Sequence, residues 1–538
     1  MIPSGVSASD WTKALAEFRT AVGPDWVFTS DEDVALYRDA YSPEWGEPTE
    51  RLVSAAIAPV EREQVQAIVR TANRYRIPIY PVSTGKNLGY GGSAPNLSGS
   101  VVLDLKRMRK IVEVNDKRHF AIVEPGVSYF DLHHHIRANK LRSWIDCPDP
   151  GWGSLVGNAL DHGVGHTLTS YRDHFQSHCG MEIVLPNGEL MRTGMAALPG
   201  SETWADFRYG FGPHVDGLFG QGNFGVVTKM GFHLMPQPEA YLSREVLLPR
   251  RKDIIALTEI VNELEYLGII GMPEYSSPLA PFRYTNMDTE LKALLARPDS
   301  FTTDIVDEFA ARRGRAVWAV KLQFYGAPEG ICANWENARS RLEKVIPGLR
   351  VGEQEDLRFP LTDEQEQAVG KKVLVGIPNM NVFSLGARSD LNPQPRDGHL
   401  LFTPIIPKDG ESILKAQSLF ADALRGTDLE TVYSAITAPY TWIYRAFVLA
   451  AGFPVSRGDS AINRRSRDAM RRLIDLGAAH GYGEYRTPPL FQDQVAGTYG
   501  FNDGILRRFS ETLKDAVDPN GIIAAGRGGI WPRHLRKA

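Results

Sequence analysis

The segment Pro81-Val-Ser-Thr-Gly-Lys-Asn-Leu-Gly-Tyr-Gly-Gly92 decides the fold of this chain, because it is a glycine-rich turn placed directly after a β-α-β pattern. Residues 53–58 are a short apolar run that predicts a strand. Residues 61–76 carry apolar side chains on one helical face, and residues 77–82 predict a second strand. The order strand, helix, strand therefore leads the chain into the turn.

Small residues in this turn bring backbone N–H groups together without side chains between them. Such a nest binds phosphate or pyrophosphate. The spacing lacks the Gly-x-x-x-x-Gly-Lys-Ser/Thr pattern of P-loop enzymes, and no helix of the Rossmann kind follows. Two interpretations stay open at this point: a phosphate-binding loop of another kind, or a plain turn between strands.

The bulk composition is that of an ordinary globular protein. The 538 residues are 43% hydrophobic and 23% charged, with a formal net charge of −4. A chain of this length is expected to form about two to four domains. The charge favours neither nucleic acid nor an anionic membrane as a partner.

The sequence contains three cysteines, Cys147, Cys179 and Cys332. This small, odd number argues against a disulfide framework and is consistent with a reducing compartment. The first residues lack the basic and apolar regions of a signal peptide. Apolar runs also stay shorter than the roughly 20 residues that cross a bilayer. We therefore expect a cytoplasmic protein.

The residue composition and the predicted secondary structure change twice along the chain. Residues 1–238 alternate short strands and helices and are rich in glycine, and Pro236-Gln-Pro238 ends this part. Residues 239–482 show helical stripes, for example at 254–267, and predict an α+β domain of their own. Residues 483–538 are again rich in glycine and proline. We expect the chain to leave its first domain, build a second, and come back.

The triple histidine at 133–135 is the one cluster that suggests metal binding. Adjacent helical residues point in different directions, so these three side chains do not converge on one ion. We therefore expect no metal site.

Several residues are candidates for chemistry, each with a plain alternative. Asp149 lies in a kinked Pro-Asp-Pro-Gly loop, where it is either an active-site acid or the acceptor of an Asx turn. Tyr485 and Arg486 are adjacent, close to the predicted boundary between residues 482 and 483. They would hold an anionic ligand or form an ion pair between domains. His399 precedes an apolar run and is either functional or a hydrogen-bonding residue at the start of a strand.

Taken together, four motifs resemble the vanillyl-alcohol oxidase/p-cresol methylhydroxylase family of flavoproteins, especially its bacterial eugenol oxidase-like 4-phenol oxidases. They are the turn at 83–92, Pro-Asp-Pro-Gly-Trp-Gly-Ser at 148–154, Gly-Glu-Tyr-Arg-Thr at 483–487 and Asp-Pro-Asn-Gly-Ile-Ile-Ala at 518–524. The resemblance implies a two-domain α+β fold. One domain, built from both chain ends (1–238 and 483–538), binds FAD, and residues 239–482 form a cap over it.

The resemblance also assigns residues to FAD. Positions 83–87 would wrap the pyrophosphate, His399 falls where histidyl members attach the flavin covalently, and Arg527 would face the pyrimidine end of the flavin. The full set that the resemblance places at the cofactor is Pro81, Ser83, Thr84, Gly85, Lys86, Asn87, Leu88, Gly89, Pro148, Gly153, Ser154, Gly157, Asn158, Gly163, His166, Gly225, Val226, Val227, His399, Arg486 and Arg527.

For the substrate, the resemblance implies that Tyr90, Tyr485 and Arg486 bind a phenol oxygen as phenolate, in a pocket that also includes Thr403 and Val432. One cation and two hydroxyl groups favour the charged form of the phenol and so lower its pKa. The family chemistry is benzylic hydride transfer to flavin N5, a p-quinone methide, and reoxidation by O2 to H2O2. The resemblance places Asp149 beside N5, as a base toward water.

The chain also departs from the family. His166 stands where relatives have Tyr, and residues 438–442 read Ala-Pro-Tyr-Thr-Trp in place of a histidine-containing stretch. These changes permit bulkier, lignin-derived phenols. Other functions remain open: a hydroxylase that uses a cytochrome, a hydroxy-acid dehydrogenase of the same fold, or a non-catalytic flavin-binding protein. The expected partners are a phenol, O2 and copies of the chain in a homodimer or higher oligomer, with neither nucleic acid nor membrane.

Overall fold

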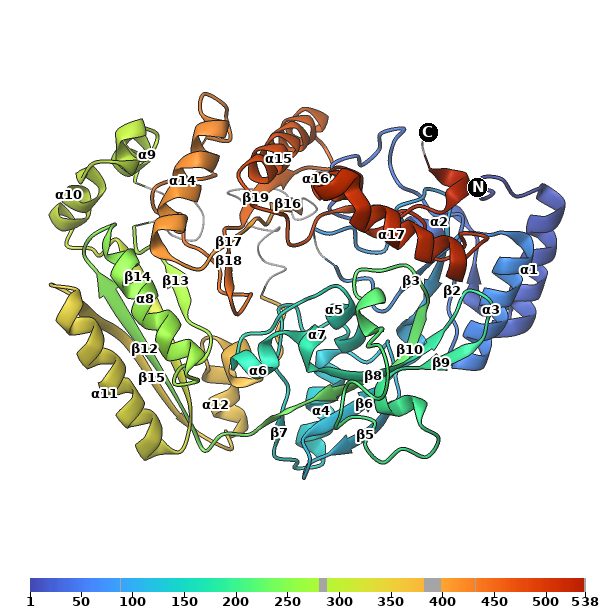
Figure 1. Ribbon diagram of the computed structural model, residues 1–538, viewed down its shortest axis with the longest axis horizontal. Helices are drawn as coiled ribbons and strands as arrows, with labels where there is room; N and C mark the ends of the chain where they lie inside the picture. The colour runs from blue at the N-terminus through green and yellow to red at the C-terminus, as the bar shows by residue number, and fades with distance from the viewer. Residues whose placement is uncertain (88, 280–287, 382–397, 431, 537–538) are drawn as a thin grey trace.

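The computed structural model describes the chain except residues 88, 280–287, 382–397, 431 and 537–538 (Figure 1). Its first sheet has the strand order β1-β2-β4-β3. Strands β2, β4 and β3 are parallel, β1 is antiparallel to β2, and the predicted β-α-β unit is confirmed to within a few residues. The elements of this layer are α1 (Ala8–Val22), β1 (Val27–Phe28), α2 (Asp31–Ala35), β2 (Ala55–Ile57), α3 (Arg62–Tyr75), β3 (Ile79–Val82) and β4 (Val101–Asp104).

The second sheet is antiparallel, with the order β5-β6-β10-β8-β9. Strands β8 and β9 form a hairpin within this sheet. Its strands and the neighbouring elements are β5 (Ile111–Asn115), β6 (Phe120–Val123), α4 (Tyr129–Ala138), β7 (Ser143–Trp144), α5 (Leu155–Leu160), α6 (Thr169–Arg172), α7 (His174–Ser177), β8 (His178–Val184), β9 (Leu190–Arg192), β10 (Val226–His233) and β11 (Met235–Pro236).

The end of the chain returns to the first sheet. Ile523 pairs in parallel with Ile79 of β3, and the Ala524 amide donates to the Ile79 carbonyl over 2.8 Å. The buried ammonium of Lys514, in α17 (Phe501–Val517), donates to the Asn223 and Ile523 carbonyls. In Figure 1 the red α17 accordingly lies on the same side as the blue N-terminal elements. The helix α16 (Gln492–Thr498) precedes it.

The central part of the chain surrounds a large apolar core of its own, on the left of Figure 1. A four-stranded sheet of order β13-β14-β12-β15 is covered by α8 and α11, and α14 and α15 pack nearby. The elements are β12 (Ala240–Leu248), α8 (Asp253–Tyr266), β13 (Glu274–Ser276), α9 (Thr289–Leu295), α10 (Ile305–Arg312), β14 (Trp318–Gly326), α11 (Pro328–Val345), β15 (Arg350–Arg358), α12 (Asp363–Ala368), β16 (Gly398–Phe402), β17 (Ile405–Pro407), α14 (Gly410–Leu424), β18 (Ala446–Val448), β19 (Ala451–Val455) and α15 (Ser460–Ala479).

A buried ion network joins the central part to the N-terminal part. Glu265 of α8 contacts Arg172 of α6 over 2.8 Å and also pairs with Lys408. All three side chains are almost completely shielded from solvent. Because removing one charge from such a network leaves the others unpaired in the interior, the contact couples the two parts firmly.

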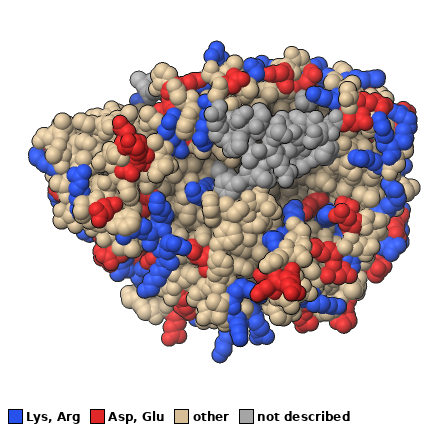
Figure 2. Space-filling view, turned by 180° about the vertical axis from the view of Figure 1, so that it is seen from behind, with Lys and Arg blue, Asp and Glu red and all other residues tan. Residues whose placement is uncertain are grey.

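At the surface, acidic and basic side chains are interspersed over the face shown in Figure 2. None of the helices within the described ranges combines the length and the apolar character that a membrane span requires.

Candidate functional site

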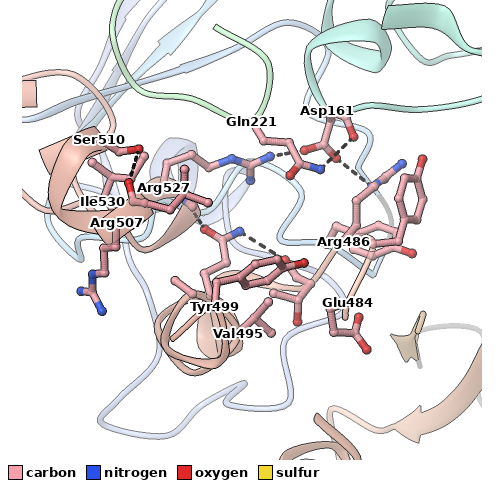
Figure 3. Close-up of a pocket in the computed structure, with 17 residues that line it drawn as sticks. Asp161, Gln221, Glu484, Arg486, Val495, Tyr499, Arg507, Ser510, Arg527 and Ile530 are labelled. Atoms are coloured by element: carbon pink, nitrogen blue, oxygen red, sulfur yellow. Dashed lines mark hydrogen bonds and ion pairs between the residues drawn. The ribbon is translucent and has the colours of Figure 1, made fainter. Parts of the chain in front are cut away.

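A cavity of about 250 Å³ lies between the C-terminal segment and the first part of the chain (Figure 3). Its wall combines charged groups from distant segments with several tyrosines and a few apolar residues. The lining residues are Tyr90, Asp161, Gln221, Glu484, Tyr485, Arg486, Thr487, Gln492, Val495, Ala496, Tyr499, Leu506, Arg507, Ser510, Arg527, Gly528 and Ile530.

Asp161 is the carboxylate that organises the cavity wall. It is the C-cap residue of the short helix α5, and two guanidinium groups approach it from opposite sides in Figure 3. The Nε atom of Arg486 lies 3.1 Å from one carboxylate oxygen, and Arg527 pairs with the other. Asn87 donates to Asp161 over 2.8 Å and accepts from Arg486 over 2.8 Å, which ties the glycine-rich turn to the same cluster.

The charges in this cluster shift one another's ionisation. Burial alone would raise the pKa of Asp161, but Arg486 and Arg527 hold that pKa below its usual range. Burial works against the charge of each guanidinium, yet Asp161 outweighs it and raises the pKa of both Arg486 and Arg527. All three groups are therefore charged, and two positive charges share one negative charge.

Tyr90 and Tyr485 flank the Arg486 guanidinium. The guanidinium carbon lies 4.0 Å from the centre of the Tyr90 ring and 5.6 Å from that of Tyr485. Burial raises the pKa of both phenol groups, although the charge of Arg486 opposes the shift. Both side chains consequently keep their hydroxyl hydrogens, and the hydroxyl of Tyr485 donates to the His162 carbonyl.

Glu484 adds a proton-holding group to the cavity wall. Its carboxylate accepts from the Thr403 amide over 3.1 Å and from the Thr403 hydroxyl over 3.0 Å. Burial nevertheless raises the pKa of Glu484 to about 8, because Thr403 offsets only part of the desolvation. At neutral pH the carboxyl is therefore mainly neutral. The Thr403 hydroxyl, which has one hydrogen for both contacts, also lies 2.9 Å from the Arg486 carbonyl, so Thr403 holds residues 484–486 next to the end of β16.

The glycine-rich turn has the geometry of a backbone cradle. Gly85, Gly89 and Gly91 adopt φ values of 67°, 74° and 110°, which side chains other than glycine rarely accept. A Cβ atom on Gly89 would lie 3.4 Å from the ring of His399, so the histidine packs directly against the turn. The Tyr41 ring packs on the other side of His399, with 5.0 Å between ring centres.

A second group of small residues meets the turn from α5. A Cβ atom on Gly157 would lie 2.1 Å from the Ser83 hydroxyl, so only glycine lets the turn come this close to the helix. Ser154 caps α5 by accepting from the Gly157 amide over 3.1 Å. The Asn158 amide contacts His174 and Tyr129. The exposed backbone, the small residues and the adjoining guanidinium groups fit a large anionic ligand of the dinucleotide kind.

The structure does not bring every predicted residue to this cavity. Within the described part of the chain, Asp149, His399, Thr403 and Val432 do not line it. Asp149 lies in the loop between β7 and α5 and is half-buried. Burial lowers the pKa of His166 to about 4, so its imidazole is neutral. Leu88, also placed at the cofactor by the resemblance, lies outside the described residues.

Sequence reasoning missed the two carboxyl groups of the cavity wall. Asp161 stands three residues after Asn158, which the resemblance places at the cofactor. Glu484 directly precedes the predicted Tyr485–Arg486 pair. Acidic residues next to predicted site residues were the available signal, because buried cations need counter-charges. Gln221, which also lines the cavity, had no comparable signal.

Comparisons with known proteins agree with this geometry. The family model described as the FAD binding domain matches residues 53–194. The 4-cresol dehydrogenase [hydroxylating] flavoprotein subunit of Pseudomonas putida is 33% identical over 98% of both chains. A 1'-carboxy-chondrochloren decarboxylase of Chondromyces crocatus is 28% identical over 97% of this chain and 98% of its own length.

Two solved structures share the whole fold. The 4-ethylphenol oxidase of Gulosibacter chungangensis, in complex with isoeugenol, superimposes with a TM-score of 0.82 at 33% identity, over 100% of both chains. A p-cresol methylhydroxylase with substrate bound gives a TM-score of 0.81 at 29% identity, over 98% of this chain and 99% of the other.

Proposed function

Because the chain belongs to the vanillyl-alcohol oxidase/p-cresol methylhydroxylase family of flavoproteins, we propose that it oxidises para-substituted phenols at the benzylic carbon, with O2 as acceptor and H2O2 as product. It is an FAD-dependent oxidoreductase of the phenol-oxidising type. The substrates that we propose are 4-hydroxybenzyl alcohols, 4-alkyl and 4-allyl phenols, and bulkier lignin-derived phenols.

The surplus positive charge of the cavity wall is the observation that carries this proposal. Arg486 and Arg527 contribute two positive charges, Asp161 contributes one negative charge, and Glu484 is mainly neutral at pH 7. Arg507, the third arginine of the wall, pairs with Glu511 over 3.1 Å, so one positive charge is left over. Two tyrosine hydroxyls lie beside it. An oxyanion of a flat aromatic ligand is the chemistry that this combination stabilises.

Arg486 would act by favouring the ionised form of the bound phenol. An opposite charge within about 4–6 Å typically lowers the pKa of an acid by one to three units, and two hydroxyl donors add to that effect. In this proposal the phenolate oxygen replaces the His162 carbonyl as the acceptor of the Tyr485 hydrogen. The new bond is stronger because its acceptor is charged. Ionisation raises the electron density at the para position and weakens the benzylic C–H bond.

FAD, when bound, supplies the two-electron oxidant. The turn at 83–87 and the Ser154–Asn158 segment would hold its pyrophosphate, and Arg527 would face the flavin. We also propose that His399 carries a covalent link to the cofactor and that Asp149 serves as a base toward water. Support for the link is the contact of His399 with Gly89 of the turn. A further part of the proposal is that 1–238 and 483–538 form one FAD domain, which the pairing of Ile79 with Ile523 supports.

The test of the function is a screen of para-substituted phenols with the purified flavoprotein under air, with H2O2 release as the readout. Arg486→Gln should lower kcat/KM by 100-fold or more, because it removes the charge that stabilises the phenolate. The matched control is Arg465→Gln, which removes a guanidinium from an exposed ion pair with Asp428. Equal kinetics of the Arg486 variant and the control would remove Arg486 from the substrate site.

The covalent link has its own test. The wild-type protein should stay yellow after acid precipitation, whereas His399→Ala should release its flavin into the supernatant. Flavin that acid strips from the wild type would contradict the link without touching the proposed reaction.

A second candidate is a dehydrogenase that passes electrons to a cytochrome. It is supported by the 33% identity, over nearly the whole length, to a protein named as a 4-cresol dehydrogenase flavoprotein subunit. Comparing O2 consumption with the reduction of an artificial dye, on the same phenol, distinguishes the two acceptors.

A further inference from the structure

A second cluster of polar groups lies away from the cavity, where the loop before Gln221 packs on β8. His178 begins β8, and Asp216 begins the short 3-10 helix Asp216–Leu218. The Nε2 atom of His178 lies 2.9 Å from one Asp216 oxygen, and the Nδ1 atom of His214 lies 3.8 Å from the other. One ligand atom from each residue falls within 4.8 Å of the other two.

The hydrogen bonds of His178 orient its ring toward Asp216. Its Nδ1 atom contacts the Phe175 carbonyl, which can only accept, so Nδ1 carries a hydrogen. The Nε2 atom faces an Asp216 carboxylate oxygen that only accepts, so a positive species, either a proton or a metal cation, lies between the two atoms. An Nδ1–H bonded to a backbone carbonyl is also the usual orientation of a histidine that binds metal through Nε2.

Asp216 supplies the second, independent observation. Its side chain is completely buried, yet its Oδ1 atom has no hydrogen-bond partner among the described residues. This oxygen is the one that faces His214. A buried carboxylate oxygen without a donor is costly, so its position calls for a positive ligand.

We propose that His178, His214 and Asp216 bind one divalent transition-metal ion with the preferences of Zn²⁺. Two imidazoles and one carboxylate are a common three-ligand set for this ion. With bonds of about 2.0–2.1 Å, tetrahedral ligand atoms lie about 3.3–3.4 Å apart. The two histidines lie 2.9 and 3.8 Å from different oxygens of Asp216, so small side-chain adjustments bring one atom of each residue to this spacing. His214 is exposed, so a small rotation of its side chain completes the set, and water occupies the fourth position.

The site would fasten the loop that carries His214 to β8, and this loop leads to Gln221 in the cavity wall. Local sequence patterns do not predict this site, because His178 and His214 are far apart in the chain. The three histidines at 133–135 lie on α4, which contributes no residue to this cluster, so they serve as a control for metal binding by other histidines.

The experiment uses the full-length flavoprotein, stripped of metal by a chelator and titrated with Zn²⁺ alone against a chromophoric indicator. The wild type should bind one Zn²⁺ per chain at this site, and His214→Ala, an exposed position that leaves the fold intact, should weaken that binding at least tenfold. His134→Ala, on the 133–135 tract, should leave the stoichiometry and the affinity unchanged. Asp216→Asn should lose the site as well.

Cobalt substitution identifies the ligands. Co²⁺ at the site should give the visible bands of a tetrahedral ion without a thiolate charge-transfer band, which separates the site from binding at the exposed Cys332. At free Zn²⁺ a hundred times the dissociation constant, the folded-to-unfolded ratio of the wild type should rise about a hundredfold. Zn²⁺ binding that is absent in the wild type, or equal in wild type and His214→Ala, would overturn the proposal and leave His178 and Asp216 as an ordinary ion pair.

Discussion

Replacing Asp161 by asparagine tests whether one carboxylate holds the cavity wall together. The substitution keeps the shape of the side chain and leaves an amide oxygen for Asn87 to contact. It removes the only charge that Arg486 and Arg527 share within the described cavity wall. The three charged side chains are only 12–14% exposed, so water compensates poorly for the loss.

The magnitude follows from the geometry. Two unit charges 3.1 Å apart, the separation of Arg486 and Asp161, attract by about 5 kcal/mol at an effective dielectric constant of 20. Removing one partner of a buried ion pair typically costs about 3–5 kcal/mol, since the other charge stays behind without compensation. We therefore expect Asp161→Asn to lower the free energy of unfolding by about 3–5 kcal/mol at pH 7.

The assay is urea unfolding of the flavoprotein at several pH values, followed by circular dichroism. Because the pKa of Asp161 is lowered in the folded chain, its contribution is fully present above the ordinary aspartate pKa and is lost as the pH falls through the lowered value. The difference between wild type and variant should thus be constant from pH 7 to about 5 and shrink only in stronger acid.

The control is Asp428→Asn, which breaks an exposed ion pair with Arg465 and should cost less than about 1 kcal/mol. An equally small loss for Asp161→Asn would refute the reasoning, because the two guanidinium groups would then be stable without their shared carboxylate. A large loss that persists unchanged below pH 3 would also contradict it.

Three further predictions concern other parts of the chain. The pKa of Glu484 is about 8 in the folded protein, so between pH 5 and 8 the folded chain holds a proton that the unfolded chain has released. The free energy of unfolding should therefore fall by up to about 1.4 kcal/mol per pH unit as the pH rises through this range, and Glu484→Gln should remove this slope in denaturant titrations. Glu265→Gln leaves two buried cations unpaired and should lower the unfolding free energy by about 3–5 kcal/mol in the same assay. Gly91 has a φ of 110°, and a Cβ atom at this position would lie 2.6 Å from Pro489. Gly200 also has a positive φ, so an alanine is strained by about 1–3 kcal/mol at either position, but the space around Gly200 is open. Gly91→Ala should therefore lower the melting temperature clearly more than Gly200→Ala.

Local patterns in the sequence were sufficient to predict much of the fold. The apolar face of 61–76 and the flanking runs predict α3 between β2 and β3, and the structure has these elements there. The stripe at 254–267 likewise matches α8, Asp253–Tyr266. Such predictions succeed because helix and strand periodicities are set by neighbours a few residues apart. The domain boundaries at 238 and 482 stay a prediction, since they depend on contacts between distant segments.

The cavity could be predicted only in part. The motifs and the family resemblance predict Tyr485, Arg486 and Tyr90 as site residues, and the three line one cavity. They do not predict Asp161, because its partner Arg527 is 366 residues further along the chain and no local pattern links the two. Pairing between distant charged residues is a property of the folded backbone, so single-sequence reasoning reaches it only through a resemblance.

The charge balance of the cavity also links the fold to the proposed chemistry. Asp161 belongs to the first part of the chain, and both of its guanidinium partners belong to the last part, so the ion pairs connect these two parts. In the proposed function, the same carboxylate would compete with a bound phenolate for Arg486. A stronger interaction with Asp161 would stabilise the fold and weaken the electrostatic effect of Arg486 on the substrate, and a weaker interaction would do the reverse. We infer that Asn87, which contacts both Asp161 and Arg486, keeps this compromise in place, because it fixes the guanidinium without cancelling its charge.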